Sequence, residues 1–476
     1  MPIFTPSHRW QPAYYPFKKR RFSERVEDSL ERTFKGILWG CRMCGNCLLQ
    51  ETAFICPMAC PKGLRNGPCG GSTVDHCCVD ESRPCIWHAI FSRAEKMGRL
   101  DQLLEVMPPL DWDKTGTSAL KDVTSKIQNH GVTKTFSKVV RSSSIERNEK
   151  WDKFFTEIRQ PEWWAGDSLP HPSTLNKPVS HLEQTLAAGE FALTCEVMPP
   201  VTGNYSKFDE TLKSLKGLVN AVNITDGASA LTRTSPLFCA LRAIELDIEP
   251  VLQMAARDRT RVSFQADLIG ASSLGIRNIL LITGDHPNKG ARPFSKMDIW
   301  DYDSIQAVWM ARRMRDEAIL LDGRQIKEKL NYFIGTAAAP FASKPTYQAI
   351  RAEKKVNAGA QFLQTNLVFD LNAFEAYLEA LDQRNVLSRV HLIAGMAPIR
   401  GIQPLRYLSQ LPGIKIPDLL FKRLESSKNV NEEAHQINLE LIEKVPSMPG
   451  VKGLHFMAWH NIENLKRLII ESGLRT

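Results

Sequence analysis

The sequence predicts an α/β protein in which a C-terminal (β/α)8 TIM barrel follows a small cysteine-rich metal-binding domain and a helical linker. From about residue 190, short β-branched or apolar runs alternate with helical patterns, which is typical of parallel strands joined by helices. Eight such units in about 287 residues is the expected size of this barrel. Nine of the eleven cysteines lie between residues 41 and 85, which indicates a separate unit. A doubly wound sheet is the alternative for the C-terminal part.

Composition places the chain among ordinary globular proteins. The 476 residues carry a formal charge of +9 and are 43% hydrophobic and 24% charged, which argues against a disordered or fibrous chain. No apolar run reaches the length of a membrane span, and the first residues lack the apolar core of a secretory signal. We therefore expect a cytoplasmic protein. The basic run at residues 18–21 has acidic neighbours, so no nucleic-acid partner is expected.

Three regions are predicted along the chain: a cysteine-rich domain over residues 1–100, a helical segment and proline-rich linker over 101–188, and the barrel over 189–476. Apolar positions at helical spacing predict a helix over Ser92–Val106, which the prolines at 108 and 109 end. The proline-rich stretch 161–180 has no clear period and is interpreted as a linker or a strap over a surface.

The clustered cysteines predict a metal site, because cytosolic thiols stay reduced. The candidate ligands are Cys41, Cys44, Cys47, Cys56, Cys60, Cys69, Cys77 and Cys85. The first three have the close spacing that opens the bacterial iron–sulfur run, and both Cys56 and Cys60 precede proline. An iron–sulfur cluster is therefore favoured and zinc is the alternative. The sequence does not pair the ligands or fix whether they form one site or two.

The elements of the barrel follow in order. The predicted strands are Phe191–Val197, Val219–Thr225, Pro250–Met254, Asn278–Thr283, Tyr332–Ala337, Phe362–Val368, Val390–Ala394 and Gly453–Ala458. The helices predicted between them include Lys207–Leu218, Arg261–Leu274, Ser304–Leu321, Tyr347–Asn357 and Ala373–Leu381.

Polar side chains gather where these strands end. They are Glu196, Thr225, Gln253, Asp285 with its neighbour Gly284, Gln364 and Asn366. Taken singly, each has a structural explanation, such as a helix cap or a buried carboxylate tied to an arginine. The carboxyl ends of the strands meet at one mouth of a barrel, so together they predict an active site there.

Over about residues 190–476 the sequence resembles the methylenetetrahydrofolate reductase family. The matching motifs are Glu196–Pro200, Thr225–Ala228, Ala256–Arg259, Thr283–Pro287, Lys355–Ala360, Gln364–Asn366 and Phe369–Asp370. The cysteine-rich part resembles a domain or partner subunit that accompanies some bacterial members of that family, through Cys56–Met58, Cys60–Lys62, Asn66–Gly71, Cys77 and Cys85–Trp87. In such systems that part is associated with iron–sulfur, including 4Fe-4S, or zinc binding.

The resemblance implies a flavin-dependent interconversion of 5,10-methylenetetrahydrofolate and 5-methyltetrahydrofolate, in which FAD carries the hydride. Glu196 matches the general acid, and Asp285 matches a carboxylate beside flavin and folate. Thr225, Gly284 and Lys355 match FAD-contacting positions, and Gln253 stands where several relatives have histidine. Gln364 and Asn366 are the implied folate-binding residues. The direction is left open between methionine supply and one-carbon catabolism, as is the oligomeric state.

Some positions depart from the family pattern. Asn366 stands where many relatives have a glutamine, and Ile402 stands near the position at which NADH-using relatives have a nicotinamide-stacking phenylalanine. The stretch 455–459 lacks the tyrosine and the arginine that some relatives have there. These differences argue against direct NAD(P)H use and suggest electron delivery from a ferredoxin-like or other protein donor through the N-terminal cluster. A metal that only stabilises the N-terminal domain is the alternative. Other functions considered are a pterin-dependent methyltransferase-type barrel and a nucleic-acid module.

Overall fold

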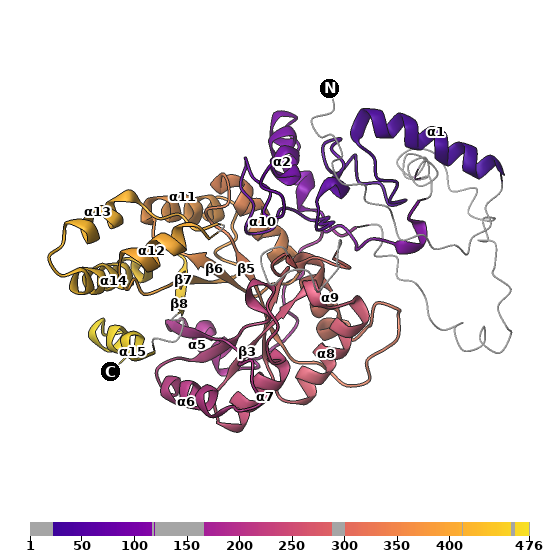
Figure 1. The fold of residues 1–476 in the computed structure, drawn as a ribbon. Coiled ribbons are helices and arrows are strands. Elements are labelled where there is room, and N and C mark those ends of the chain that lie inside the picture. The colour runs from indigo at the N-terminus through magenta and orange to yellow at the C-terminus, as the bar shows by residue number, and fades with distance from the viewer. Residues whose placement is uncertain are drawn as a thin grey trace.

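The computed structural model describes residues 22–116, 119, 166–287, 300–411, 413–457 and 462–475. Its centre is a closed barrel in which parallel strands β1 to β8 are hydrogen-bonded in sequence order. Helices surround the strands, and the cysteine-rich segment lies at one side, with α2 beside α10 (Figure 1). The predicted (β/α)8 fold is therefore confirmed, and the doubly wound alternative is wrong.

Each predicted strand overlaps its counterpart. The strands are β1 Ala192–Val197, β2 Ala221–Ile224, β3 Pro250–Ala255, β4 Asn278–Ile282, β5 Phe333–Ala338, β6 Phe362–Leu367, β7 His391–Met396 and β8 Val451–Phe456. The predicted end of the last strand, Ala458, lies outside the described residues.

The helices of the barrel are α5 His181–Ala187, α6 Ser206–Leu215, α7 Pro236–Glu245, α8 Arg261–Ser273, α9 Ser304–Asp316, α10 Pro345–Asn357, α11 Leu371–Asp382, α12 Ile402–Ser409, α13 Asp418–Ser426, α14 Val430–Ser447 and α15 Ile462–Glu471. The cysteine-rich segment contributes α1 Phe22–Trp39 and α2 Ile86–Lys96. None of the helices in the described ranges combines the length and apolarity needed to cross a bilayer.

Two helix predictions need correction. The helix predicted over Ser92–Val106 is wrong, since α2 stops at Lys96 and Gly98 then adopts a left-handed φ of 64°. A 3-10 helix over Leu100–Leu104 replaces the remainder. The helix predicted to reach Leu321 ends at Asp316, because Ala318 has a left-handed φ of 54° that an α-helix does not accept.

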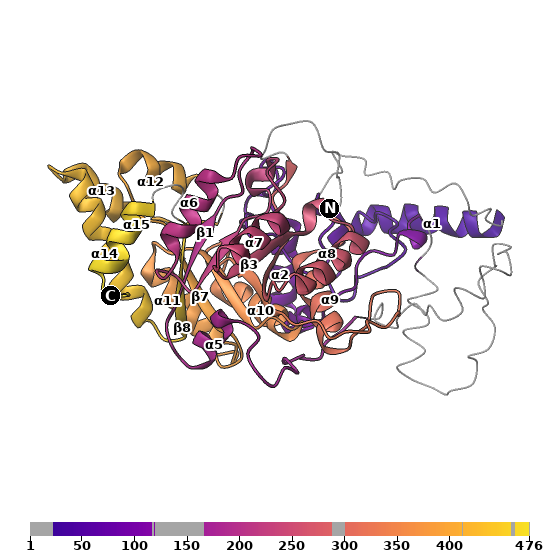
Figure 2. The same cartoon turned by 90° about the horizontal axis from the view of Figure 1, so that it is seen from below.

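The N-terminal end of the barrel is closed by apolar side chains. Alternate residues of a strand point to the same side. One inward residue from each of seven strands packs with two leucines of α5 in a single buried cluster. Its members are Leu182, Leu186, Ala192, Ala221, Val251, Leu280, Phe333, Phe362 and Ile393. The rings of Phe333 and Phe362 stack with centroids 4.8 Å apart. Figure 2 shows α5 beneath the strands. The polar chemistry therefore gathers at the opposite end.

Gly335 tests how tightly this layer is packed. An added Cβ at Gly335 would lie 2.0 Å from the Phe362 ring, so Gly335→Ala is expected to destabilise the protein by about 1–3 kcal/mol through overpacking. Gly270 in α8 is the matched control, because a Cβ there meets nothing within 4 Å and alanine favours a helix by about 1 kcal/mol. Urea unfolding measures both. An unchanged stability of Gly335→Ala would show that the layer is loosely packed.

The cysteine-rich segment packs directly on the barrel. Trp87 and Phe91 of α2 share a buried cluster with Tyr347 and Ile350 of α10, and the rings of Phe91 and Tyr347 stack at 5.1 Å. Residues 166–175 form a strap, as Asp167 pairs with Val106 and accepts a 2.7 Å hydrogen bond from the indole of Trp309. The strap interpretation agrees with these contacts, while the domain boundaries at residues 100 and 188 stay predictions.

Candidate active site at the mouth of the barrel

Polar side chains line the barrel above its apolar end. Alternate residues of a strand point to the same side. Glu196, Asn223 and Gln364 therefore point into the barrel, as Ala192, Ala221 and Phe362 do on the same three strands. Asn223 lies opposite Glu196 in the β1–β2 register, and its amide donates a 2.8 Å hydrogen bond across the barrel to Gln364. The structure thus brings the predicted residues of β1 and β6 together.

Glu196 has the electrostatics of a proton donor. Its side chain is partly exposed to solvent, but it is surrounded by protein atoms deep in the mouth. Desolvation disfavours the carboxylate and raises the pKa of Glu196 to about 7. The carboxyl group is therefore protonated in a substantial fraction of molecules near neutral pH, which general-acid catalysis requires.

The loops that follow β2, β3 and β4 meet one another at the mouth. The Asp285 carboxylate, after β4, accepts a 2.9 Å hydrogen bond from the main-chain N–H of Ser229, after β2. Gly284 adopts a φ of 85°, and a Cβ there would approach the Cβ of Arg257 at 2.9 Å. This position needs glycine both for its backbone and for the close contact.

Arg257 is a site residue that the sequence did not single out. It belongs to the Ala256–Arg259 motif, which by itself indicates no role for this arginine. Its side chain is 4% exposed, pairs with Asp258 and donates a 3.4 Å hydrogen bond to the main-chain carbonyl of Asp285. Its guanidinium also approaches Gly227, where a Cβ would lie 2.5 Å away. Only the fold brings these three loops together, so no local sequence signal reveals this role.

Two buried polar atoms at the mouth fit a polar ligand. Thr225 Oγ1 and Asn223 Oδ1 have no hydrogen-bond partner among the described residues, and both residues are at most 2% exposed. Buried polar atoms are normally paired, so these atoms suit a bound group that carries hydrogen-bonding atoms. Gln253 is also buried, at 6% exposure, on the neighbouring strand β3. The residues present are therefore compatible with a flavin.

Two further predicted residues lie at the same end of the barrel. Lys355 of α10 is 4% exposed, its ammonium donates to the carbonyl of Ala337 in β5, and burial lowers its pKa well below the usual value. It faces a main-chain carbonyl here, so phosphate binding by Lys355 stays a prediction. Asn366 donates a long 3.5 Å hydrogen bond to the carbonyl of Gly413.

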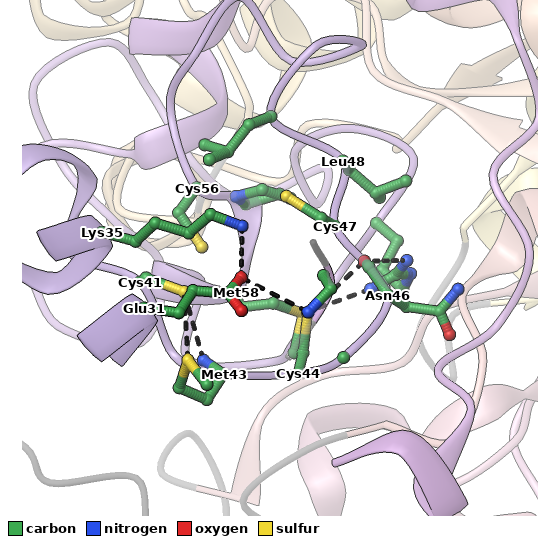
Figure 3. A pocket seen from close by; sticks show the side chains of 15 residues that line it. Glu31, Lys35, Cys41, Met43, Cys44, Asn46, Cys47, Leu48, Cys56 and Met58 are labelled. Atoms are coloured by element: carbon green, nitrogen blue, oxygen red, sulfur yellow. Dashed lines mark hydrogen bonds and ion pairs between the residues drawn. The ribbon is translucent and has the colours of Figure 1, made fainter. Parts of the chain in front are cut away.

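The predicted metal ligands fall into two groups. Four line one cavity of about 20 Å³ between α1 and the following loop: Cys41, Cys44, Cys47 and Cys56 (Figure 3). Desolvation raises the pKa of Cys56 to about 12, as expected for a buried thiol. Beside this cavity, Lys35 forms an ion pair with Glu31 of the same helix.

The other predicted ligands, Cys60, Cys69, Cys77 and Cys85, lie near one another, because Cys69, Cys85 and Cys77 all act electrostatically on Cys60. Cys78, which the prediction left out, has its sulfur 2.9 Å from that of Cys69. All eleven cysteines are free thiols. Across the described ranges, however, no group of three or more Cys, His, Asp or Glu side chains is arranged to hold a metal ion. The structure therefore does not support a cluster or a zinc site.

Comparison with known proteins decides the family. The family described as methylenetetrahydrofolate reductase matches residues 181–473, which is most of the chain and all eight strands. The chain belongs to the methylenetetrahydrofolate reductase family. A second family, described as methylene-tetrahydrofolate reductase C terminal, matches residues 22–113. That match covers every predicted cysteine ligand.

Individual relatives are distant. A probable methylenetetrahydrofolate reductase (NADPH) of Caenorhabditis elegans is 26% identical over 48% of this chain and 33% of its own. Methylenetetrahydrofolate reductase 2 of Schizosaccharomyces pombe is 28% identical over 43% and 33%. The 5,10-methylenetetrahydrofolate reductase of Pectobacterium carotovorum is 23% identical over 59% and 91%. The chain thus spans a third of the two eukaryotic relatives but most of the bacterial one.

Among solved structures, an uncharacterized protein from Clostridium thermocellum that binds two copies of 5-methyl-5,6,7,8-tetrahydrofolic acid is 18% identical. It aligns with a TM-score of 0.44 over 62% of this chain and 98% of that chain.

Proposed function

We propose that this protein is an oxidoreductase that interconverts 5,10-methylenetetrahydrofolate and 5-methyltetrahydrofolate with FAD as cofactor. The family membership supports the reaction class. The observation that carries the proposal is Glu196, whose raised pKa of about 7 gives a protonated carboxyl beside unpartnered polar atoms of Asn223 and Thr225. A structural carboxylate would instead be paired with a cation or capping N–H groups.

The acid role of Glu196 follows from its surroundings. Ring opening of the methylene substrate needs a proton on the departing nitrogen, and a carboxyl with a pKa near 7 can give that proton and recover it. The side chain of Glu196 points from β1 into the barrel, where a ligand bound in the mouth would contact it. Gln364, held by Asn223, would offer its amide to the pterin edge.

FAD supplies hydride transfer when it is bound. The residues proposed to hold it are Thr225, Gln253, Gly284, Asp285 and Lys355. Thr225 presents its unpartnered hydroxyl, and the left-handed backbone of Gly284 lets this loop pack closely against Arg257 and Ala255. Asp285, fixed by the N–H of Ser229, would orient toward both cofactor and folate.

We make two proposals for the cysteine-rich segment. Its thiols form a metal centre, and a protein donor delivers electrons through it. We derive no step through a metal. A cytoplasmic location and an oligomeric state are likewise proposals.

An ultraviolet–visible spectrum of anaerobically purified protein, with FAD, iron, zinc and sulfide assayed on the same sample, tests these proposals. Flavin bands are expected. Iron with acid-labile sulfide would support the cluster, and zinc without iron would favour a structural site. Failure to bind added FAD would overturn the proposed function and favour the methyltransferase-type barrel.

The pH dependence of the reaction tests the acid role. The pKa of Glu196 is raised to about 7, so the acid form predominates below that pH and is lost as the pH rises through it. We expect the rate at which 5,10-methylenetetrahydrofolate oxidises the reduced enzyme to fall about tenfold per pH unit well above 7. Stopped-flow absorbance between pH 5.5 and 9 measures this rate. A rate that stays constant across that range would contradict the assignment.

A further inference from the structure

A lysine of the cysteine-rich segment reaches the mouth of the barrel. Lys62 is 3% exposed, and its ammonium donates a 3.1 Å hydrogen bond to the main-chain carbonyl of Gly284, 222 positions away in sequence. The same ammonium lies 5.2 Å from the centroid of the Trp300 ring, and it interacts electrostatically with Asp285. Lys62 therefore contacts the loop that carries two of the predicted cofactor-binding residues.

Trp300 completes a clamp on this loop. Its main-chain N–H donates to the carbonyl of Lys62 at 3.1 Å, and its indole N–H donates to the carbonyl of Thr283 at 2.6 Å. The imidazole of His286 stacks on the same indole, with centroids 5.6 Å apart. Trp300 thus contacts both ends of the Thr283–His286 loop, and Lys62 holds the carbonyl of Gly284 between them.

The same segment also reaches the rim of the mouth at β5 and β6, the next two strands of the barrel. The carbonyl of Gly70 lies 2.6 Å from where a Cβ of Gly413 would stand, and the amide nitrogen of Asn366 lies 2.9 Å from that point. Gly70 itself would bring a Cβ within 3.5 Å of Ala339, just after β5. Residues 62–70 therefore lie along one side of the rim, from the loop after β4 to the end of β6.

The choice of a lysine is informative. Burying an ammonium group is costly unless hydrogen bonds and charges compensate it, and an apolar side chain would join two packed surfaces at lower cost. The ammonium of Lys62 donates a hydrogen bond to a carbonyl of this loop. It interacts electrostatically with the Cys69 and Cys78 thiols of its own segment and, beyond them, with the Asp285 carboxylate of the loop. Its hydrogen bond to Gly284 therefore fixes the main chain of the loop and brings a positive charge beside it.

We propose that Lys62 is a positioning residue of the active site, supplied by the cysteine-rich segment, which holds the Thr283–His286 loop in the conformation that binds FAD. This inference rests on the proposed function, because it concerns the proposed flavin site. It makes the cysteine-rich segment part of the catalytic architecture independently of any metal.

The test compares Lys62→Met, Lys62→Arg and Lys344→Met in the full chain. Lys344 is the matched control, because it also joins the barrel to the cysteine-rich segment, through an exposed 2.9 Å ion pair with Glu95. Titration of apoprotein with FAD, followed by quenching of flavin fluorescence, gives the affinity. Thermal unfolding without FAD reports the stability of each variant.

We expect Lys62→Met to weaken FAD binding at least about tenfold, the loss that corresponds to one hydrogen bond from a charged group. Lys62→Arg is expected to recover most of it, and Lys344→Met to bind as the wild type does. Equal FAD affinity in Lys62→Met and the wild type would overturn the proposal, as would a loss in Lys62→Met that Lys62→Arg does not reduce. Wild-type protein that binds no FAD would instead contradict the proposed function.

Discussion

Glu196→Gln is expected to slow the oxidation of the reduced enzyme by 5,10-methylenetetrahydrofolate by about 10²–10⁴-fold, the contribution typical of a general acid. The amide keeps the shape of the carboxyl group but has no proton to give. FAD affinity should change little, because Glu196 is assigned to the substrate. The rate that remains should lose its fall above pH 7, since the carboxyl group whose pKa desolvation raises to about 7 is no longer present.

Single-turnover mixing measures this rate, and the bound FAD content of the variant is its control. Glu183→Gln is a matched substitution, because Glu183 is also a buried glutamate whose pKa is raised by desolvation, but it caps the main-chain N–H of Val179 near the closed end of the barrel. It should leave the rate near that of the wild type. A Glu196→Gln rate within a few-fold of the wild type would remove Glu196 from the acid role.

Asp226→Ala is expected to lower the free energy of unfolding by about 2–3 kcal/mol, because it removes one of the two carboxylates that pair with the buried Arg259 guanidinium, the other being Asp267. The Asp226 and Arg259 side chains are 10% and 11% exposed and form an ion pair. Asp226 also accepts a 2.7 Å hydrogen bond from the N–H of Ala255 at the end of β3. The substitution should therefore also loosen the loops after β2 and β3 that border the proposed flavin site.

Lys216→Ala is the control for this loss. The Lys216–Asp247 pair is 3.0 Å long but exposed, with side chains 49% and 92% accessible, so its loss should cost less than about 1 kcal/mol. Urea unfolding of both variants gives the comparison. If the two variants lost the same small amount of stability, the Asp226–Arg259 pair would not hold these loops.

The sequence was sufficient for the barrel and for much of its mouth, because both depend on local periodicity. The period of two that identifies β1 also places Glu196 on its inward side, and strand order brings Asn223 beside it. Short motifs placed Gly284 and Asp285 after β4. These features follow from spacing within single strand–helix units.

Contacts between residues far apart in the chain could not be predicted from the sequence. Lys62 belongs to the Cys60–Lys62 motif, but nothing near it in sequence indicates a hydrogen bond to Gly284. Arg257 contacts the loops after β2 and β4, and only the fold brings these loops to it. The end of α2 at Gly98 was also missed, because the apolar spacing continues into the 3-10 helix that follows.

Anaerobic mixing of the photoreduced, FAD-loaded protein with 5,10-methylenetetrahydrofolate tests the central claim most directly, because it needs no electron donor. We expect the flavin absorbance to return and one 5-methyltetrahydrofolate to form for each flavin oxidised. Flavin that stays reduced while the protein remains folded and loaded would contradict the proposed reaction.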